Sequence, residues 1–577
     1  MSLAAAGTPS VSSLAALLGG RRLFSGLAWL AIVGTTLLIA YPIGWIVYDA
    51  FVVDGRLDVE GFLAIVLDPA ILKVVTNTIA VAGLSGLLAL SVGAAFAWVN
   101  ERTDATSGWT RDLLPLLPLL VPQIAGVTGW VMLLSPRAGL LNVQFRAIFG
   151  SGQESGIPSG PLDIFTFTGL VLVMALYLVP YVYLIVSAAL RNLDPNLEEA
   201  SRISGAGPFK TLWRVTLPAI KPALFASILI LVMLGFAFFS VPIIIGTGAG
   251  IDVLSVTIYR QLYNYPPRTD IAIVLSLFMM SIVQAALLLQ HLVARAGRFA
   301  TIGGKAGGGA KVRLGRWRWP ALGAVFFYLM ATSVIPVVGL LIVSLQPFWT
   351  PNIDVSKFTL ANYDFVLFES SLSSSALVNS LLLGAIGGTL GMLLAAFLAL
   401  CGSNVGGTLA KAIDAITALP AAFPHTVLGV GFLVTFSQGW LNIHGTLLLL
   451  LLVYLVMFLP QAARSASSSL AQVGRELVEA SHVFRASSLR TFRRIVIPLM
   501  LPGLVAGWVI LFVQMAGELT ASALLSGPSN PVVGLVLLDL WENGSFPQLT
   551  AMALIMTVLD TAVVLLVLRY FRGALRS

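Results

Sequence analysis

Long, almost uncharged hydrophobic stretches alternate with short polar segments along the whole chain. Because no water in the hydrocarbon core of a bilayer can satisfy an open backbone, a chain crosses it as a helix of about 20 apolar residues. Twelve stretches meet this requirement, and we predict a transmembrane helix in each. They cover residues 27–50, 74–98, 113–135, 167–190, 222–246, 271–293, 320–345, 376–400, 413–436, 444–463, 501–525 and 549–571.

Composition agrees with lipid as the main solvent of this chain. Of its 577 residues, 58% are hydrophobic and 10% are charged, whereas a globular domain carries about 25% charged residues. The predicted fold class is therefore an all-α integral membrane protein with about 12 transmembrane helices. The excess of 33 Lys and Arg over 25 Asp and Glu predicts no nucleic-acid binding, because apolar runs keep the basic residues apart. The single cysteine, Cys401, excludes an intrachain disulfide.

The positions of Lys and Arg predict the orientation, because cytoplasmic loops retain positive charge. With the N-terminus in the cytoplasm, 26 of the 33 basic residues fall on the cytoplasmic side and seven on the other. We therefore predict a multi-pass protein with both termini in the cytoplasm. The pair Arg21-Arg22 before Leu23-Phe24 resembles a twin-arginine export signal. The length of the apolar stretch and the absence of a small-residue cleavage site favour a membrane anchor instead.

The sequence repeats itself once. Asn77 with Asn379 and Pro122 with Pro424 share an offset of 302, and prolines further on share an offset of 280. Because each half has an even number of spans, the repeats are parallel and related by an axis along the membrane normal. The predicted parts are a cytoplasmic tail (1–26), a first six-span half (27–293), a Gly-rich basic cytoplasmic linker (294–319) and a second six-span half (320–577).

The most informative segments lie in the predicted cytoplasmic loops between spans four and five of each half. In the first loop, Asp194 can cap a helix that starts at Pro195, and Gly205 can end it in the left-handed conformation. A second short helix then presents apolar residues at three-and-four spacing opposite basic ones. These residues are Phe209, Leu212 and Trp213. Such a helix could rest on lipid headgroups, but its repetition in the second half argues for a shared partner.

Both loops resemble the EAA loop of ABC importer permeases. Its pattern is Glu-Ala-Ala, three residues, Gly, nine residues, Ile, one residue and Leu-Pro. The matching residues of the first copy are Glu199, Ala200, Gly205, Leu217 and Pro218. Those of the second copy are Glu479, Ala480, Ile495 and Pro498, with Leu489 and Phe492 on the apolar side. Arg485 stands where the pattern has Gly. The sequence therefore does not predict the geometry of the turn in the second loop.

This resemblance covers the six-span halves over almost the whole chain. It implies the type I ABC importer permease fold in a bacterial inner membrane. It also implies that each loop is a coupling helix for one of two copies of a cytoplasmic ATPase, and that a periplasmic binding protein delivers a small-molecule or ion substrate. ATP and Mg would then be bound by the ATPase, and this chain would bind no cofactor and be no enzyme.

Motifs of nucleotide and metal chemistry are absent from the sequence. The only Gly-Lys pair, Gly304-Lys305, precedes Ala306 and makes no phosphate loop. The four histidines fall singly, without metal-ligand spacing, so we predict no metal site. The alternative from another class is a secondary transporter driven by an ion gradient, which places paired ionisable residues in the membrane. Candidates for such residues are few: Glu518, and Asp560, for which a helix-packing hydrogen bond is the simpler role.

Five polar residues within or beside the spans are candidates for the pathway or a gate. They are Glu518, Thr520, Ser240, Asn77 and Asn379. Glu518 lies roughly 25 Å along span eleven from its cytoplasmic start, near the outer end. Acids rarely sit in spans without a role, which makes Glu518 the leading candidate.

The segment 517–528 and the fusion of two halves resemble permeases of the ferric-iron importer group. This resemblance predicts ferric iron as the substrate. Similar fused permeases serve thiamine, aminoethylphosphonate and related small polar solutes, so these and a polyamine stay open as alternatives. The external segments carry more acids than bases, and a docking protein should therefore meet a mildly acidic face.

Overall fold

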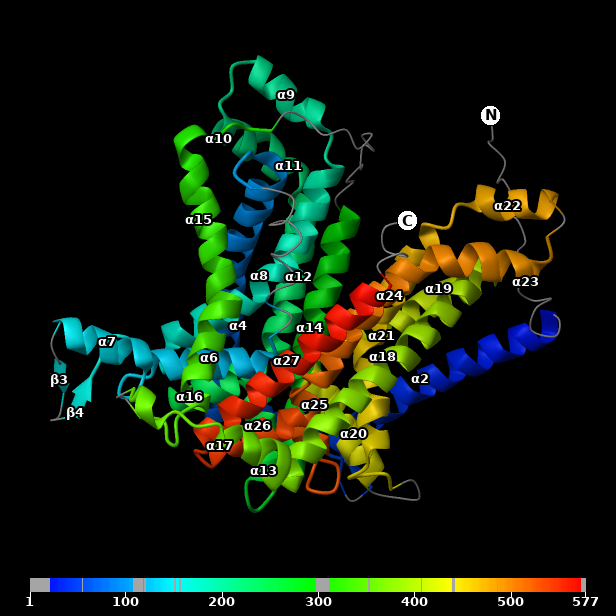
Figure 1. Cartoon of the computed structure of the whole chain (residues 1–577). Helices are drawn as coiled ribbons and strands as arrows, with labels where there is room; N and C mark the ends of the chain where they lie inside the picture. The colour runs from blue at the N-terminus through cyan, green and yellow to red at the C-terminus, as the bar shows by residue number, and fades with distance from the viewer. Residues whose placement is uncertain are drawn as a thin grey trace. The chain divides into compact units, whose positions relative to one another are not determined.

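The computed structural model describes residues 21–53, 55–106, 118, 121–149, 152–154, 157–296, 311–350, 353–405, 407–437, 442–484 and 486–571. These residues are almost entirely helical (Figure 1). Within them, nine helices are long and apolar enough to cross a membrane, and two further helix pairs, each bent at a short break, raise this number to eleven. The predicted all-α membrane fold is confirmed.

The described chain forms two compact units, and each contains the first span of the other repeat. One unit covers the described residues of 50–371 and 537–557, and the other those of 1–49, 372–536 and 558–577. The first span, α2 (Arg21–Phe51), thus groups with helices of the second half. The boundaries predicted at 294–319 concern the linear repeat and stay a prediction.

The unit built on the first half contains two short antiparallel hairpins besides its helices. The strands are β1 (Val52–Val53), β2 (Arg56–Leu57), β3 (Gly152–Glu154) and β4 (Ile157–Ser159). The helices are α3 (Val59–Val66), α4 (Pro69–Arg102), α6 (Gln123–Leu134), α7 (Leu140–Phe149), α8 (Phe167–Asn192), α9 (Pro195–Ile203), α10 (Pro208–Thr211), α11 (Leu217–Ala219), α12 (Lys221–Ala237), α13 (Leu254–Tyr263), α14 (Thr269–Ala296), α15 (Arg318–Leu329), α16 (Ile335–Ser344) and α17 (Ala361–Asp364).

Close helix contacts hold this unit together. Gly93 of α4 lies against Val182 of α8, where a Cβ atom would clash with that side chain. The first span of the second half packs here too, since the hydroxyl of Tyr328 in α15 donates to the carbonyl of Leu176 at 3.0 Å. Gly129 of α6 has no room for a side chain beside the backbone of α16.

The other unit is built on the second half. Its helices are α18 (Ser371–Val405), α19 (Gly407–Ala418), α20 (His425–Ser437), α21 (Leu447–Ala471), α22 (Arg475–Val483), α23 (Ser488–Thr491), α24 (Ile497–Ala516) and α25 (Thr520–Leu525), together with α2. The helices α26 (Val533–Glu542) and α27 (Phe546–Tyr570) contribute to both units. Ala28 and Ile32 of α2 share a buried cluster with Leu398, Cys401 and Ile413.

Several predicted straight spans are broken. The span predicted at 413–436 bends by 96° between 410–422 and 425–437. Phe423 is extended there (φ −114°, ψ 125°), because the ring of the following Pro424 disfavours a helical conformation in the residue before it. In the span predicted at 113–135, Val121 and Pro122 are not helical, and α6 begins directly after them. The described residues thus hold nine to eleven of the about 12 predicted transmembrane helices, and some of these are bent or interrupted.

Candidate functional site

The first predicted cytoplasmic loop folds into two short helices. The side chain of Asp194 accepts a hydrogen bond from the N–H of Asn196 at 3.0 Å, and Pro195 occupies the first position of α9. The second helix, α10, follows Gly207 and starts at a proline. The cap and both starts are those that the sequence predicts, because proline lacks the N–H that the first helical turn leaves unpaired.

The turn after α9 depends on glycine. Gly205 has a φ of +81°, which a residue with a Cβ adopts only with strain. Its N–H donates to the carbonyl of Arg202 at 2.9 Å, and the N–H of Ala206 donates to that of Ser201 at 3.1 Å. This pair of bonds is the Schellman closure of a helix. The predicted left-handed end at Gly205 is therefore present.

The second loop repeats this arrangement in α22 and α23. The N–H of Ala486 donates to the carbonyl of Ser481 at 3.0 Å, which is the same closing bond 280 residues further on. The intervening Arg485 lies outside the described residues, as does the side chain of Leu489. The closing bond thus forms although the pattern's glycine is missing from the second copy.

A hydroxyl pair joins the two short helices of each loop. Ser201 and Thr211 lie 2.9 Å apart through their oxygens, and Ser481 and Thr491 lie 2.7 Å apart. Both serines occupy the position where the EAA pattern has its second alanine. Sequence analysis missed this pair, although the identical Ser-to-Thr separation in both copies was a visible signal.

Large apolar side chains are exposed on both loops. In the first, Ile203 is 87% exposed, Phe209 74% and Trp213 69%. In the second, Val483 and Phe484 are exposed by 80% and 85%. Single exposed apolar residues need no explanation, but several on the same loop of both repeats favour an interaction surface, and Ile203 and Val483 are at aligned positions. We call these five residues the apolar loop surface.

The predicted stripe of α10 differs in one respect. Leu212 is half-buried, and so is Phe492 in the second loop. Both begin a π-helical turn, Leu212–Thr216 and Phe492–Val496, and a wider turn rotates the residues away from the 3.6-residue spacing that the prediction assumed. Of the remaining matched positions, Glu199 and Leu217 are half-buried, and exposed are Ala200, Pro218, Glu479, Ala480 and Pro498.

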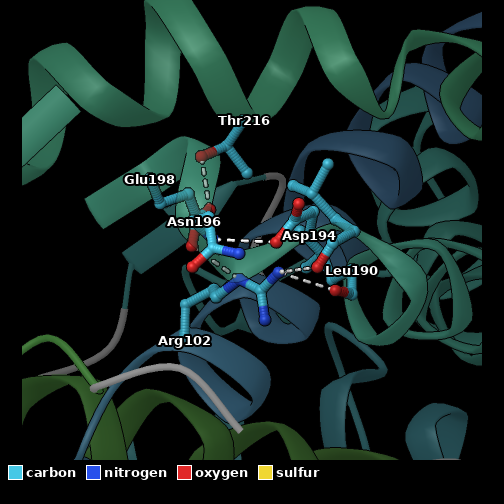
Figure 2. Close-up of polar contacts among 7 residues, drawn as sticks. Arg102, Leu190, Asp194, Asn196, Glu198 and Thr216 are labelled. Atoms are coloured by element: carbon cyan, nitrogen blue, oxygen red, sulfur yellow. Dashed lines mark hydrogen bonds and ion pairs between the residues drawn. The ribbon is translucent and has the colours of Figure 1, made fainter. Parts of the chain in front are cut away.

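The buried acid of the first loop is Glu198, which sequence analysis did not select. Figure 2 shows its carboxylate between Arg102 and Thr216. Nε of Arg102 lies 2.9 Å from one carboxylate oxygen, and the Thr216 hydroxyl donates to the other at 2.6 Å. The same guanidinium donates to the carbonyl of Leu190 at 2.7 Å. A buried carboxylate needs such partners, because burial without them costs several kcal/mol.

A small polar pocket opens beside α9. Acidic and basic side chains line it together, so it carries no strong charge of one sign. The lining residues are Glu101, Arg102, Pro195, Glu198, Glu199, Arg202 and Lys311. The described residues contain no group of three His, Cys, Asp or Glu side chains that could hold a metal ion.

Two of the pathway candidates hold backbone in place. The amide of Asn77 donates to the carbonyl of Asp252 at 3.2 Å, and that of Asn379 donates to the carbonyl of Pro531 at 2.8 Å. Each bond fixes the segment just before a short helix, α13 or α26. The same asparagine-to-carbonyl hydrogen bond therefore occurs in both repeats. A pathway role for either asparagine stays a prediction.

Glu518 lies at the break between α24 and α25. Its carboxylate accepts hydrogen bonds from the N–H of Ala521 at 3.0 Å and from the N–H of Ser522 at 3.0 Å. The hydroxyls of Ser522 and Tyr454 are 2.6 Å apart and extend the network. Glu518 thus satisfies the start of α25, and Thr520 and Ser240 are buried. Their pathway roles stay predictions.

Sequence analysis favoured a helix-packing hydrogen bond for Asp560, which lies in α27, but the residue does not make this bond. It is fully buried, and neither carboxylate oxygen has a hydrogen-bond partner among the described residues.

The two helical repeats, each with a pair of short helices joined by a hydroxyl pair before its fifth span, are typical of a permease subunit of an ABC importer. The chain matches the family "Binding-protein-dependent transport system inner membrane component" over residues 86–298 and 387–576. It belongs to this family, which places it in the inner membrane as a multi-pass protein.

Named relatives are permeases of ferric and phosphonate systems. The chain is 26% identical to the "Ferric transport system permease protein FbpB" of Actinobacillus pleuropneumoniae over 91% of its own length and 75% of the relative. It is 26% identical to the "Putative ferric transport system permease protein FbpB 1" of Haemophilus influenzae, over 84% and 75%. The "Putative 2-aminoethylphosphonate transport system permease protein PhnV" of Salmonella typhimurium is 26% identical over 41% of this chain and 85% of the relative.

Among solved structures, a bacterial ABC transporter that imports the acidic polysaccharide alginate is similar to 48% of this chain and 96% of its own matched chain. The TM-score is 0.40 and the sequence identity is 19%.

Proposed function

We propose that this chain carries ferric iron from a periplasmic binding protein to the cytoplasm, driven by a separate ATPase that docks one copy on each coupling loop. The observation that supports this most is the repeated loop, with the same closing bond after its first helix, the same hydroxyl pair and an exposed apolar residue at the aligned positions 203 and 483. An apolar surface of this kind fits a groove on a partner protein.

The structure of the loops suits them to transmit a displacement of the ATPase to the membrane spans. In each loop the hydroxyl pair joins the first short helix to the second. In the second half the second helix continues into α24, and in the first half it meets α12 at a bend of 71°. Closure of the ATPase pair would displace the loops and favour the outward-open state of the pathway. Hydrolysis would reset it. In this scheme the ATPase binds ATP and Mg, and the permease provides the two conformations between which the pathway alternates.

Ferric iron is proposed because two relatives that cover most of this chain are ferric permeases. Aminoethylphosphonate is the second candidate, supported by a relative that matches 41% of the chain. The test is ATP hydrolysis by the chain in nanodiscs with its ATPase and binding protein. We expect stimulation by binding protein loaded with ferric iron. Stimulation by aminoethylphosphonate, thiamine or a polyamine instead would change the cargo, and gradient-driven uptake without any ATPase would overturn the class of mechanism.

Reversing the charge of the motif glutamates should weaken docking. We expect Glu199→Lys with Glu479→Lys to lower co-purification of the ATPase by at least about thirtyfold, because a like charge at an interface costs on the order of 1 kcal/mol or more at each of the two sites. Glu60→Lys, an exposed acid of α3 on the predicted external side, is the matched control. Unchanged co-purification of the double variant, with normal membrane insertion, would remove these glutamates from the docking surface.

A further inference from the structure

The two coupling loops differ in how they are fastened to the spans. In the first half, Arg102 at the end of α4 pairs with Glu198 of α9 and also donates to the carbonyl of Leu190 near the end of α8 (Figure 2). Glu198 is 4% exposed. One buried ion pair therefore ties the coupling helix to two membrane helices.

A second ion pair lies one residue away. Glu101, also at the end of α4, accepts from Nε of Arg191 in α8 at 2.8 Å and from the Ser187 hydroxyl at 2.5 Å. The carboxylate side chain is 5% exposed. The cytoplasmic ends of α4 and α8 are thus joined independently of the loop.

The end of the linker makes a third contact with the cytoplasmic end of α4, in addition to the two ion pairs. Val312 forms a parallel bridge with the chain after α4: its N–H donates to the carbonyl of Arg102 at 2.8 Å, and its carbonyl accepts from the N–H of Asp104 at 3.2 Å. The Asp104 side chain accepts from the N–H of Leu314 at 3.0 Å. The linker therefore contributes backbone to the base of the first coupling loop.

The second half cannot build either ion pair. The repeat offsets of 302 and 280 align each member of the network with a residue of the second half, and all of these are uncharged. Arg102, Glu198 and Thr216 align with Asn404, Val478 and Val496, and Glu101 and Arg191 align with Ser403 and Ala471. All four charges are lost together, which is the pattern expected when a paired network is absent as a whole, because half of a buried ion pair destabilises more than none.

We propose that the first coupling loop moves as one piece with α4 and α8, that the second loop is fastened less tightly, and that the two ATPase copies therefore contribute unequally to opening the pathway. Arg102 and Glu198 are the positioning residues of this device. The inference rests on the proposed docking of an ATPase on both loops. A stiff loop passes a displacement to the spans, whereas a compliant loop absorbs part of it.

Amide hydrogen exchange of the full permease, without any ATPase, tests the fastening by itself. We expect amides of α9 to exchange at least about tenfold more slowly than those of α22, and Glu198→Gln to remove most of this difference. Thr216→Val, which deletes only one bond to the carboxylate, should have an intermediate effect and serves if the first variant folds poorly. Equal exchange of the two helices in the wild type would overturn the proposal.

Stimulated ATP hydrolysis tests the transmission. In the assembled importer, Glu198→Gln should lower the ratio of stimulated to basal ATPase activity at least about threefold without lowering ATPase co-purification. The matched change in the second loop, Val478→Gln, should alter neither value. Faster exchange in α9 with an unchanged ratio would overturn the transmission step. A wild type that no ATPase joins would overturn the proposed function and this step with it, while slow exchange of α9 would still establish the fastening.

Discussion

Aspartate in place of Phe209 and Trp213 is expected to release the ATPase from the first coupling loop and to abolish transport. Both side chains are mostly exposed in the permease, by 74% and 69%, so their replacement removes little from its own core. In a docked complex they would be buried. Full burial of one aromatic side chain contributes about 1.5–3 kcal/mol, and two would therefore account for about a thousandfold in the dissociation constant.

The measurement is the dissociation constant of the ATPase for purified permease in nanodiscs, with the thermal unfolding midpoint as the check on folding. Phe348→Asp with Val355→Asp is the matched control, because these side chains are 76% and 70% exposed and lie on the predicted external side. The control should bind the ATPase like the wild type. An unaltered dissociation constant for the loop variant would show that the apolar loop surface has another partner, such as lipid.

The parts of the site that sequence analysis predicted are those with local causes. Asp194, Pro195 and Gly205 act through the backbone within a few residues, and the structure shows each of them in the expected role. None of these three residues recurs in the second copy, where Gly474, Arg475 and Arg485 stand at the aligned positions, so the prediction of the caps rested on the first copy alone. Helix caps are therefore readable from a single sequence when the residues concerned are close together.

The buried network could not be predicted in this way. Arg102 and Glu198 are 96 positions apart, and nothing in either segment announces that they meet. Because Glu198 lies next to Glu199 of the motif, the sequence predicts it only as a further acidic residue on a solvated helix. Only the fold brings α4 beneath the loop. The repeat did contain one indication of the network, because all four of its charged residues in the first half align with uncharged residues in the second.

The bends of the spans were missed for a different reason. Hydropathy reports how apolar a stretch is, and a helix broken at Pro424 is as apolar as a straight one. The restriction that Pro424 places on Phe423 was visible in the sequence. It did not decide the prediction, because membrane helices often contain proline within their length, as α8 and α21 do at Pro180 and Pro460.

Removal of the Glu518 carboxylate is expected to unfold the second half at lower temperature. Glu518 is 7% exposed, and its two oxygens accept from the N–H groups of Ala521 and Ser522 and from the Ser522 hydroxyl. In Glu518→Ala the buried N–H groups of Ala521 and Ser522 lose this acceptor, and each orphaned group costs about 1–3 kcal/mol. The Ser522 hydroxyl keeps the backbone carbonyl of residue 518 as an acceptor. The first half has Phe238 at the aligned position, so the loss is confined to one repeat.

Thermal unfolding of the purified permease measures this loss, and Glu518→Gln separates the two roles of the residue. A glutamine oxygen can still accept one of these bonds, so we expect its unfolding midpoint to lie between those of the wild type and the alanine variant. Glu542→Ala removes an exposed acid and should leave the midpoint unchanged. If both Glu518 variants unfold like the wild type but lose stimulated ATP hydrolysis, the carboxylate acts on the substrate, because a helix cap cannot be removed from a buried site without a loss of stability.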